Sequence, residues 1–284
     1  MTPFGTRLHA AVEARGPLCA GIDPHAGLLA EWGLDDTAGG LERFALAAAE
    51  ALAPHVAVVK PQSAFYERFG SLGIAVLERV VATCRDAGAL VLLDVKRGDI
   101  GSTSQAYADA YLDPASPLAC DAVTVSPYLG FGSLTPFVDT ARRHGGGLFV
   151  LALTSNPEGA EVQRARVGDR TVAGVVLDHL RALNADAGPS DAGPSGDGAP
   201  GSFGAVVGAT LGDVGEDLDV GGPLLAPGYG AQGGTVDDLR RIFGPAARRV
   251  LPSTSRGLLR AGPSAQALAD AARATNDTLR AGLW

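Results

Sequence analysis

Eight short apolar segments alternate with helical segments along the chain, and this alternation constrains the fold more than any other feature. The segment at residues 90–93 has no turn residue inside it, which is typical of a strand buried on both faces of a parallel sheet. We predict strands at residues 18–22, 56–59, 90–93, 121–125, 147–153, 203–209, 223–226 and 249–252. Predicted helices cover residues 4–15, 41–52, 65–85 with a break near 70–73, 102–112, 134–144, 167–185, 235–241 and 264–280.

Eight strand–helix units in roughly 250 residues predict a TIM (β/α)8 barrel, an α/β fold, as a single domain over residues 1–284. An open, doubly wound sheet is the alternative. That fold predicts a glycine-rich phosphate-binding turn after the first strand, whereas this chain has Asp23-Pro24-His25 there.

A low-complexity segment at residues 186–202 interrupts the pattern of strands and helices. The sequence Asp-Ala-Gly-Pro-Ser occurs there twice in tandem, at 186–190 and 191–195. Such a composition cannot build a packed core. We interpret the segment as a solvent-exposed loop insertion in the barrel.

The composition narrows the functional classes and the partners. A net charge of −8 argues against a nucleic-acid surface, so an anionic substrate would have to be held by a few well-placed cations. Three widely spaced cysteines fit neither a disulfide framework nor a zinc site, and they indicate a reducing compartment. The first residues contain no signal-peptide core, and no apolar run is long enough to span a membrane. We expect a cytoplasmic protein with neither a nucleic-acid nor a membrane partner.

Charged residues appear abruptly where the third predicted strand ends. Asp94 and Lys96 are two residues apart, so on a strand they point to the same side. Gly98 lets the chain turn, and Asp99 adds a second carboxylate. Ser102 or Thr103 is the expected cap of the helix that follows. A salt-bridged strand end without function is the competing interpretation, but buried charges at this position are costly unless they are paired or used.

Polar side chains follow other predicted strands in the same way. In a barrel the carboxyl ends of all strands meet at one mouth, where active sites of this fold lie. The residues concerned are Asp23, Lys60, Asp94, Lys96, Asp99, Thr154, Ser155, Gln232 and Arg256. Their common location predicts one site.

The loops after the seventh and eighth strands suggest a phosphate site. Gly228, Gly230, Gly233 and Gly234 would let backbone N–H groups approach an anion, and Arg256 would supply a bidentate cation. A merely flexible glycine-rich loop is the alternative. The five histidines show no ligand spacing, so we predict neither a metal nor another cofactor.

The segment Asp94-Val95-Lys96-Arg97-Gly98-Asp99-Ile100 resembles the signature of the orotidine 5'-phosphate decarboxylases. The resemblance extends from about Asp23 to Arg256. The segment Thr-Ser-Asn-Pro-Glu-Gly at 154–159 resembles the sequences of the longer bacterial subgroup of the family. The tandem-repeat insertion is not part of the family pattern. The resemblance implies decarboxylation of orotidine 5'-phosphate (OMP) to UMP and CO2, without metal or cofactor, by a homodimer with shared active sites.

The resemblance also implies a role for each matching residue. The catalytic network would be Lys60, Asp94, Lys96 and Asp99, and the substrate contacts would be Asp23, Ile100, Thr103, Ser155, Pro227, Gln232 and Arg256. Asp99 would reach the site of the partner subunit, in a shared region lined by Ile100 and Thr103. Asp23 would hold the ribose, Ser155 or Thr154 the pyrimidine, and Gln232 and Arg256 the phosphate.

Two competing functions remain. One is a metal-dependent phosphosugar decarboxylase or aldolase of the same barrel superfamily, which shares Asp-x-Lys-x-x-Asp. Such enzymes resemble one another in carrying a carboxylate after strand 2, whereas this chain has Lys60 there. The second competing function is that of an inactive phosphate-binding barrel, which the fold alone does not exclude. Loss of OMP absorbance, measured with and without a chelator, distinguishes the three.

Overall fold

The computed structural model describes residues 1–185 and 201–283, and its main sheet is a closed barrel of eight parallel strands. The strands are β1 (Cys19–Ile22), β2 (Val58–Pro61), β3 (Leu90–Arg97), β4 (Ala122–Val125), β5 (Gly147–Leu153), β8 (Phe203–Val207), β9 (Leu224–Pro227) and β10 (Val250–Thr254). They neighbour one another in chain order, and β10 closes the barrel by pairing with β1. The TIM barrel is confirmed and the open sheet is excluded. Residues 186–200 of the predicted insertion lie outside the described residues.

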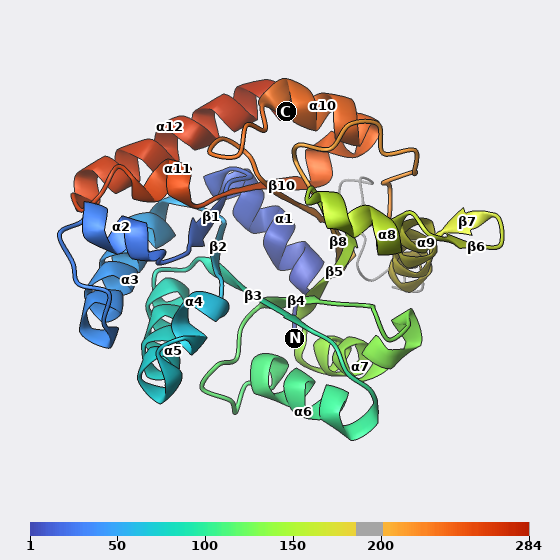
Figure 1. Cartoon of the computed structure of the whole chain (residues 1–284), viewed down its shortest axis with the longest axis horizontal. Helices are drawn as coiled ribbons and strands as arrows, with labels where there is room; N and C mark the ends of the chain where they lie inside the picture. Colours follow the sequence, from blue (N-terminus) through green and yellow to red (C-terminus); the bar gives the residue numbers. More distant parts are fainter. Residues whose placement is uncertain (186–200, 284) are drawn as a thin grey trace.

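Helices surround the barrel, as Figure 1 shows. They are α1 (Phe4–Arg15), α2 (Ala26–Glu31), α3 (Ala38–Leu52), α4 (Ala64–Glu67), α5 (Gly70–Asp86), α6 (Gly101–Leu112), α7 (Thr135–His144), α8 (Ala160–Gln163), α9 (Val172–Ala185), α10 (Val236–Phe243), α11 (Arg256–Leu259) and α12 (Ala265–Leu283). Short 3-10 turns lie at Ala53–His55, Phe131–Leu134, Pro157–Gly159 and Gly244–Arg249. The larger core cluster packs most of these helices, but not α1, against the outer face of the sheet.

A second core cluster fills the barrel interior beneath the site. Each strand contributes one buried residue to it: Cys19, Val58, Leu92, Ala122, Phe149, Val206, Leu225 and Leu251. Helix α1, at the centre of the view in Figure 1, packs on this layer through Phe4, Leu8 and Val12. A Cβ atom at Gly147 would come within 2.2 Å of the Phe4 ring, so only glycine permits this approach. The helix therefore closes the end of the barrel opposite the strand carboxyl ends.

Two local predictions are wrong. Residues 167–171 are not helical, because β6 (Arg166–Val167) and β7 (Arg170–Thr171) form a hairpin before α9 begins. The two-residue Gly168-Asp169 connection, with Gly168 at φ +61°, is a hairpin turn. Neither Ser102 nor Thr103 caps α6, since the extended Ile100 occupies the cap position and no side chain caps the helix.

The predicted cap of the helix after the seventh strand is confirmed. Thr235 caps α10 in a reciprocal capping box with Asp238. Cys19 and Cys84 are free and buried, and Cys120 is free and partly buried. Within the described ranges, no helix combines the length and the apolar character needed to cross a membrane.

Candidate active site

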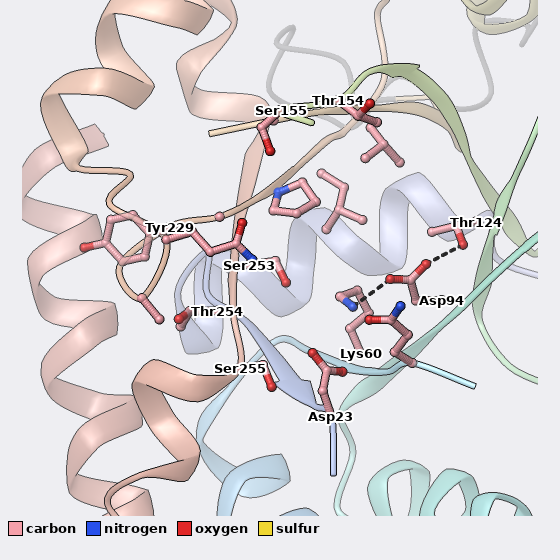
Figure 2. A pocket seen from close by; sticks show the side chains of 18 of the residues that line it. Asp23, Lys60, Asp94, Thr124, Thr154, Ser155, Tyr229, Ser253, Thr254 and Ser255 are labelled. Atoms are coloured by element: carbon pink, nitrogen blue, oxygen red, sulfur yellow. Dashed lines mark hydrogen bonds and ion pairs between the residues drawn. The ribbon is translucent and has the colours of Figure 1, made fainter. Parts of the chain in front are cut away.

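A pocket of about 490 Å³ opens at the carboxyl ends of the barrel strands. Of the predicted site residues, Asp23, Lys60, Asp94, Lys96, Ser155, Pro227, Gln232 and Arg256 line it. They come from both halves of the chain, and the closure of the barrel brings them together. These eight residues thus lie at one mouth, and Figure 2 labels Asp23, Lys60, Asp94 and Ser155 among them.

The centre of the pocket is a line of three alternating charges. The Lys60 ammonium lies 2.9 Å from one Asp94 oxygen, and the Lys96 ammonium lies 2.5 Å from the other. Lys60 and Asp94 are nearly buried, whereas the Lys96 side chain is 44% exposed. Lys96 is therefore the member of this line that is most accessible to a molecule in the pocket.

Mutual contact keeps the buried pair ionised. Burial alone raises the pKa of Asp94, but the two lysines outweigh burial and hold that pKa well below its usual range. Burial likewise lowers the pKa of Lys60, but Asp94 and Asp23 outweigh burial and hold that pKa above its usual range. The pocket thus presents fixed charges of both signs across the neutral pH range.

The backbone at Lys96 has an unusual conformation. Lys96 has φ +48°, the left-handed region that costs a non-glycine residue about 1 kcal/mol or more. The pairing of β3 with β4 also shifts register between Leu93 and Arg97. The prediction that Asp94 and Lys96 point to the same side holds, but the intervening backbone is not a regular strand.

The opposite side of the pocket is suited to an anion. The β9–α10 loop contributes Gly228 and Gln232, and the start of α11 contributes Arg256. Gly228 has φ +102°, which favours glycine and lets the loop turn back towards β10. The described residues leave the buried hydroxyls of Thr254 and Ser255 without hydrogen-bond partners. Unpaired buried hydroxyls are costly, so this side is built for a polar ligand.

Asp23 shows the same lack of a partner. Its side chain is buried at the end of β1, and its Oδ1 has no hydrogen-bond partner among the described residues. Figure 2 shows Asp23 in the pocket beside Lys60. A carboxylate with a free acceptor atom can receive a hydroxyl hydrogen bond from a ligand.

Three predicted site residues do not line this pocket: Asp99, Ile100 and Thr103. Asp99 accepts a hydrogen bond from the Ile100 amide, and Ile100 is 62% exposed. All three lie where β3 leads into α6, outside the cavity of their own chain.

Sequence reasoning missed several pocket residues, among them the polar residue Thr124 on β4, which is 1% exposed. The others that it did not assign include Gln62, Phe65, Asn156, Tyr229 and Ser253. A polar residue inside the otherwise apolar β4 segment was the available signal for Thr124. His25, to which the sequence analysis assigned no role, also lines the pocket, and its ring packs edge-on against Phe65 with centroids 4.1 Å apart.

Comparison with known proteins identifies the family. Residues 16–271 match the model of the orotidine 5'-phosphate decarboxylase / HUMPS family. The chain belongs to this family. It is 68% identical to an orotidine 5'-phosphate decarboxylase of Nocardioides sp., over 99% of this chain and all of the relative. It is 61% identical to the enzyme of that name from Streptomyces coelicolor, over 96% of this chain and 95% of the relative.

A solved structure of the family has the same architecture. The crystal structure of a putative orotidine 5'-phosphate decarboxylase from Streptomyces avermitilis superposes with a TM-score of 0.94 at 60% identity. The match covers 100% of this chain and 96% of that one. The family enzyme of Methanocaldococcus jannaschii, at 16% identity and a TM-score of 0.61, shares the fold.

Proposed function

We propose that this chain is a carboxy-lyase that converts OMP to UMP and CO2, the last step of de novo pyrimidine synthesis. The observation that carries the proposal is the Lys60–Asp94–Lys96 charge line inside a pocket whose other side is suited to an anion. Relatives named orotidine 5'-phosphate decarboxylase match nearly the whole chain at 61% to 68% identity.

The pocket offers at least one contact for each part of OMP. Gln232 and Arg256 hold the phosphate, and the free acceptor of Asp23 receives a ribose hydroxyl. Ser155 contacts the pyrimidine in preference to Thr154, because the Thr154 hydroxyl is already bonded to Asn156 and Gln163. Pro227 lines the same cavity at the end of β9.

The charge line then acts on the C6 carboxylate. The carboxylate lies beside Asp94, and the bond from C6 to the carboxyl carbon breaks as CO2 departs. The electron pair stays on C6, and the ammonium of Lys96 first stabilises this charge and then gives C6 a proton. Water returns a proton to Lys96. Lys60 keeps Asp94 ionised and in place through its 2.9 Å contact.

We further propose a homodimer in which Asp99 acts across the interface. Asp99, Ile100 and Thr103 lie outside their own pocket, at the mouth end of the barrel. Exposed apolar side chains follow the neighbouring strands β3 and β4: Ile100 is 62%, Tyr128 76% and Leu129 52% exposed. Apolar groups of this size beside a pocket mouth favour contact with a second subunit.

The alternative within the same superfamily needs a metal ion. Among residues 1–185 and 201–283, no group of three or more His, Cys, Asp and Glu side chains is placed to hold one. We therefore expect OMP turnover to survive exhaustive EDTA treatment, measured as the loss of OMP absorbance. Activity that disappears with EDTA and returns with added Mg²⁺ would instead support the metal-dependent branch, and absence of OMP turnover in untreated protein would refute the decarboxylase proposal.

A further inference from the structure

The register shift between β3 and β4 is a bulge located at the charge line. Leu93 pairs with Val123, and Arg97 pairs with Val125. Between these pairs β3 carries Asp94, Val95 and Lys96, whereas β4 carries Thr124 alone. The bulge removes the regular backbone partners of the extra β3 residues.

One side chain replaces the missing partners. The Thr124 hydroxyl oxygen accepts from the backbone amides of Val95 and Lys96, both at 3.0 Å. The same hydroxyl donates a hydrogen bond to Asp94 Oδ1 at 2.8 Å, a contact drawn in Figure 2. A hydroxyl has two lone pairs and one proton, so all of its hydrogen-bonding capacity is used.

The opposite edge of β3 is fixed in a more ordinary way. The carbonyl of Asp94 accepts from the Ser63 amide at 3.2 Å, in a bridge that extends the β2 pairing. At the bulge, β3 is therefore held by backbone on the β2 side and by the Thr124 hydroxyl on the β4 side, and backbone pairing with β4 resumes at Arg97, whose carbonyl accepts from the Ser126 amide at 2.8 Å. Among the described residues, Lys96 is the one non-glycine residue with positive φ, and its amide is held by that hydroxyl.

We propose that Thr124 is a positioning residue for the reaction. It holds the left-handed backbone of Lys96 and orients the Asp94 carboxylate, so that one side chain sets the relative placement of proton donor and carboxylate. This inference rests on the proposed function, because the placement matters only if Lys96 and Asp94 act on the same bound substrate. Thr124 itself forms and breaks no bond in the reaction.

The side-chain chemistry predicts which substitutions are tolerated. Serine retains the hydroxyl and all three hydrogen bonds. Valine has nearly the shape of threonine but can make none of the three, so the buried Val95 amide and the partly buried Lys96 amide lose their acceptor and Asp94 loses a donor. The matched control is Thr140 on α7, which is also fully buried and bonds Gln105 outside the pocket.

The test compares Thr124→Val, Thr124→Ser and Thr140→Val, each assayed for kcat and KM with OMP, for UMP affinity and for melting temperature. We expect kcat of Thr124→Val to fall about 100-fold, the scale of a small misplacement of reacting groups, with UMP affinity within about threefold of the parent protein. Thr124→Ser should retain most of kcat, and Thr140→Val should retain all of it even if its melting temperature falls. Turnover by the parent protein is measured first, because its absence refutes the proposed function rather than the role of Thr124.

Two outcomes overturn the proposal: a folded Thr124→Val protein with a kcat like that of the parent, or a Thr124→Ser protein as slow as the valine variant. If the valine variant does not fold, Thr124→Cys decides, since a thiol has similar size but makes weaker hydrogen bonds. The folded cysteine variant should lose at least about tenfold in kcat at unchanged UMP affinity, and a parent-like kcat there refutes the role.

Discussion

At the scale of single residues, the proposed mechanism assigns catalysis to the charge line and phosphate binding to the anion side of the pocket. Lys60 and Lys96 contact opposite oxygens of Asp94, so each of the three side chains has its position fixed by another. Arg256 lies across the pocket, next to the hydroxyls of Thr254 and Ser255, which find no hydrogen-bond partner among residues 1–185 and 201–283. Substitutions on the two sides should therefore have different kinetic signatures.

Replacing Arg256 by alanine tests the phosphate assignment. We expect kcat/KM for OMP to fall roughly 10- to 100-fold, the value of a charge-assisted hydrogen bond, while the fold stays intact. For orotidine, which lacks the phosphate, the loss should be much smaller. The matched control is Arg260→Ala, because Arg260 is exposed near the same helix and lies 3.8 Å from Glu31. Equal losses on both substrates would assign Arg256 a structural role.

At the scale of elements, α1 shows what a local pattern can and cannot predict. The spacing of Leu8 and Val12 predicts a helix with one apolar face, and that helix is present. Its location is determined by distant residues: Arg7 pairs with Asp121, and the Phe4 ring meets Phe149 edge-on with centroids 6.1 Å apart. No short-range signal encodes such contacts.

The same limit explains the errors near the site. Strand–helix alternation and polar strand ends were enough to predict the barrel and to predict that eight site residues lie at one mouth of it. The bulge at Lys96 was not predictable, because a register shift depends on how two strands pair. Thr124 was missed for that reason: its role exists only once β3 and β4 lie side by side.

Replacing Phe4 by alanine tests the importance of α1 packing. Phe4 is 1% exposed, so its removal leaves a cavity against the barrel interior. We expect the free energy of unfolding to fall by about 3–5 kcal/mol, measured by denaturant titration. The control His9→Ala lies on the exposed face of the same helix and should change stability little. A loss of less than about 1 kcal/mol for the Phe4 variant would contradict the proposed packing.

At the scale of the whole molecule, the position of Asp99 raises the question of whether two chains build each site, and co-refolding of two variants tests this. Homodimers of Lys96→Ala and of Asp99→Ala should each be almost inactive. In a mixed dimer one site collects both substitutions and the other collects neither. Random reassortment makes half of the dimers mixed, so equal co-refolding should restore roughly a quarter of the activity of the unmodified dimer.

Two differently tagged chains verify the exchange of subunits in this experiment. Recovered activity should follow the fraction of doubly tagged dimers. A population with proven mixed dimers and no recovered activity would place the complete site within one chain and would remove the role assigned to Asp99.

Because α1 closes one end of the barrel, it also limits where molecules can enter and leave the pocket. Among the described residues, the interior layer of one side chain per strand and helix α1 beneath it close the barrel below the pocket. The pocket opens at the carboxyl ends of the strands. Substrate and both products must therefore share one passage. In the proposed binding mode, Gln232 and Arg256 anchor UMP through its phosphate, whereas CO2 has no phosphate. We therefore expect the small product to leave first and the nucleotide last.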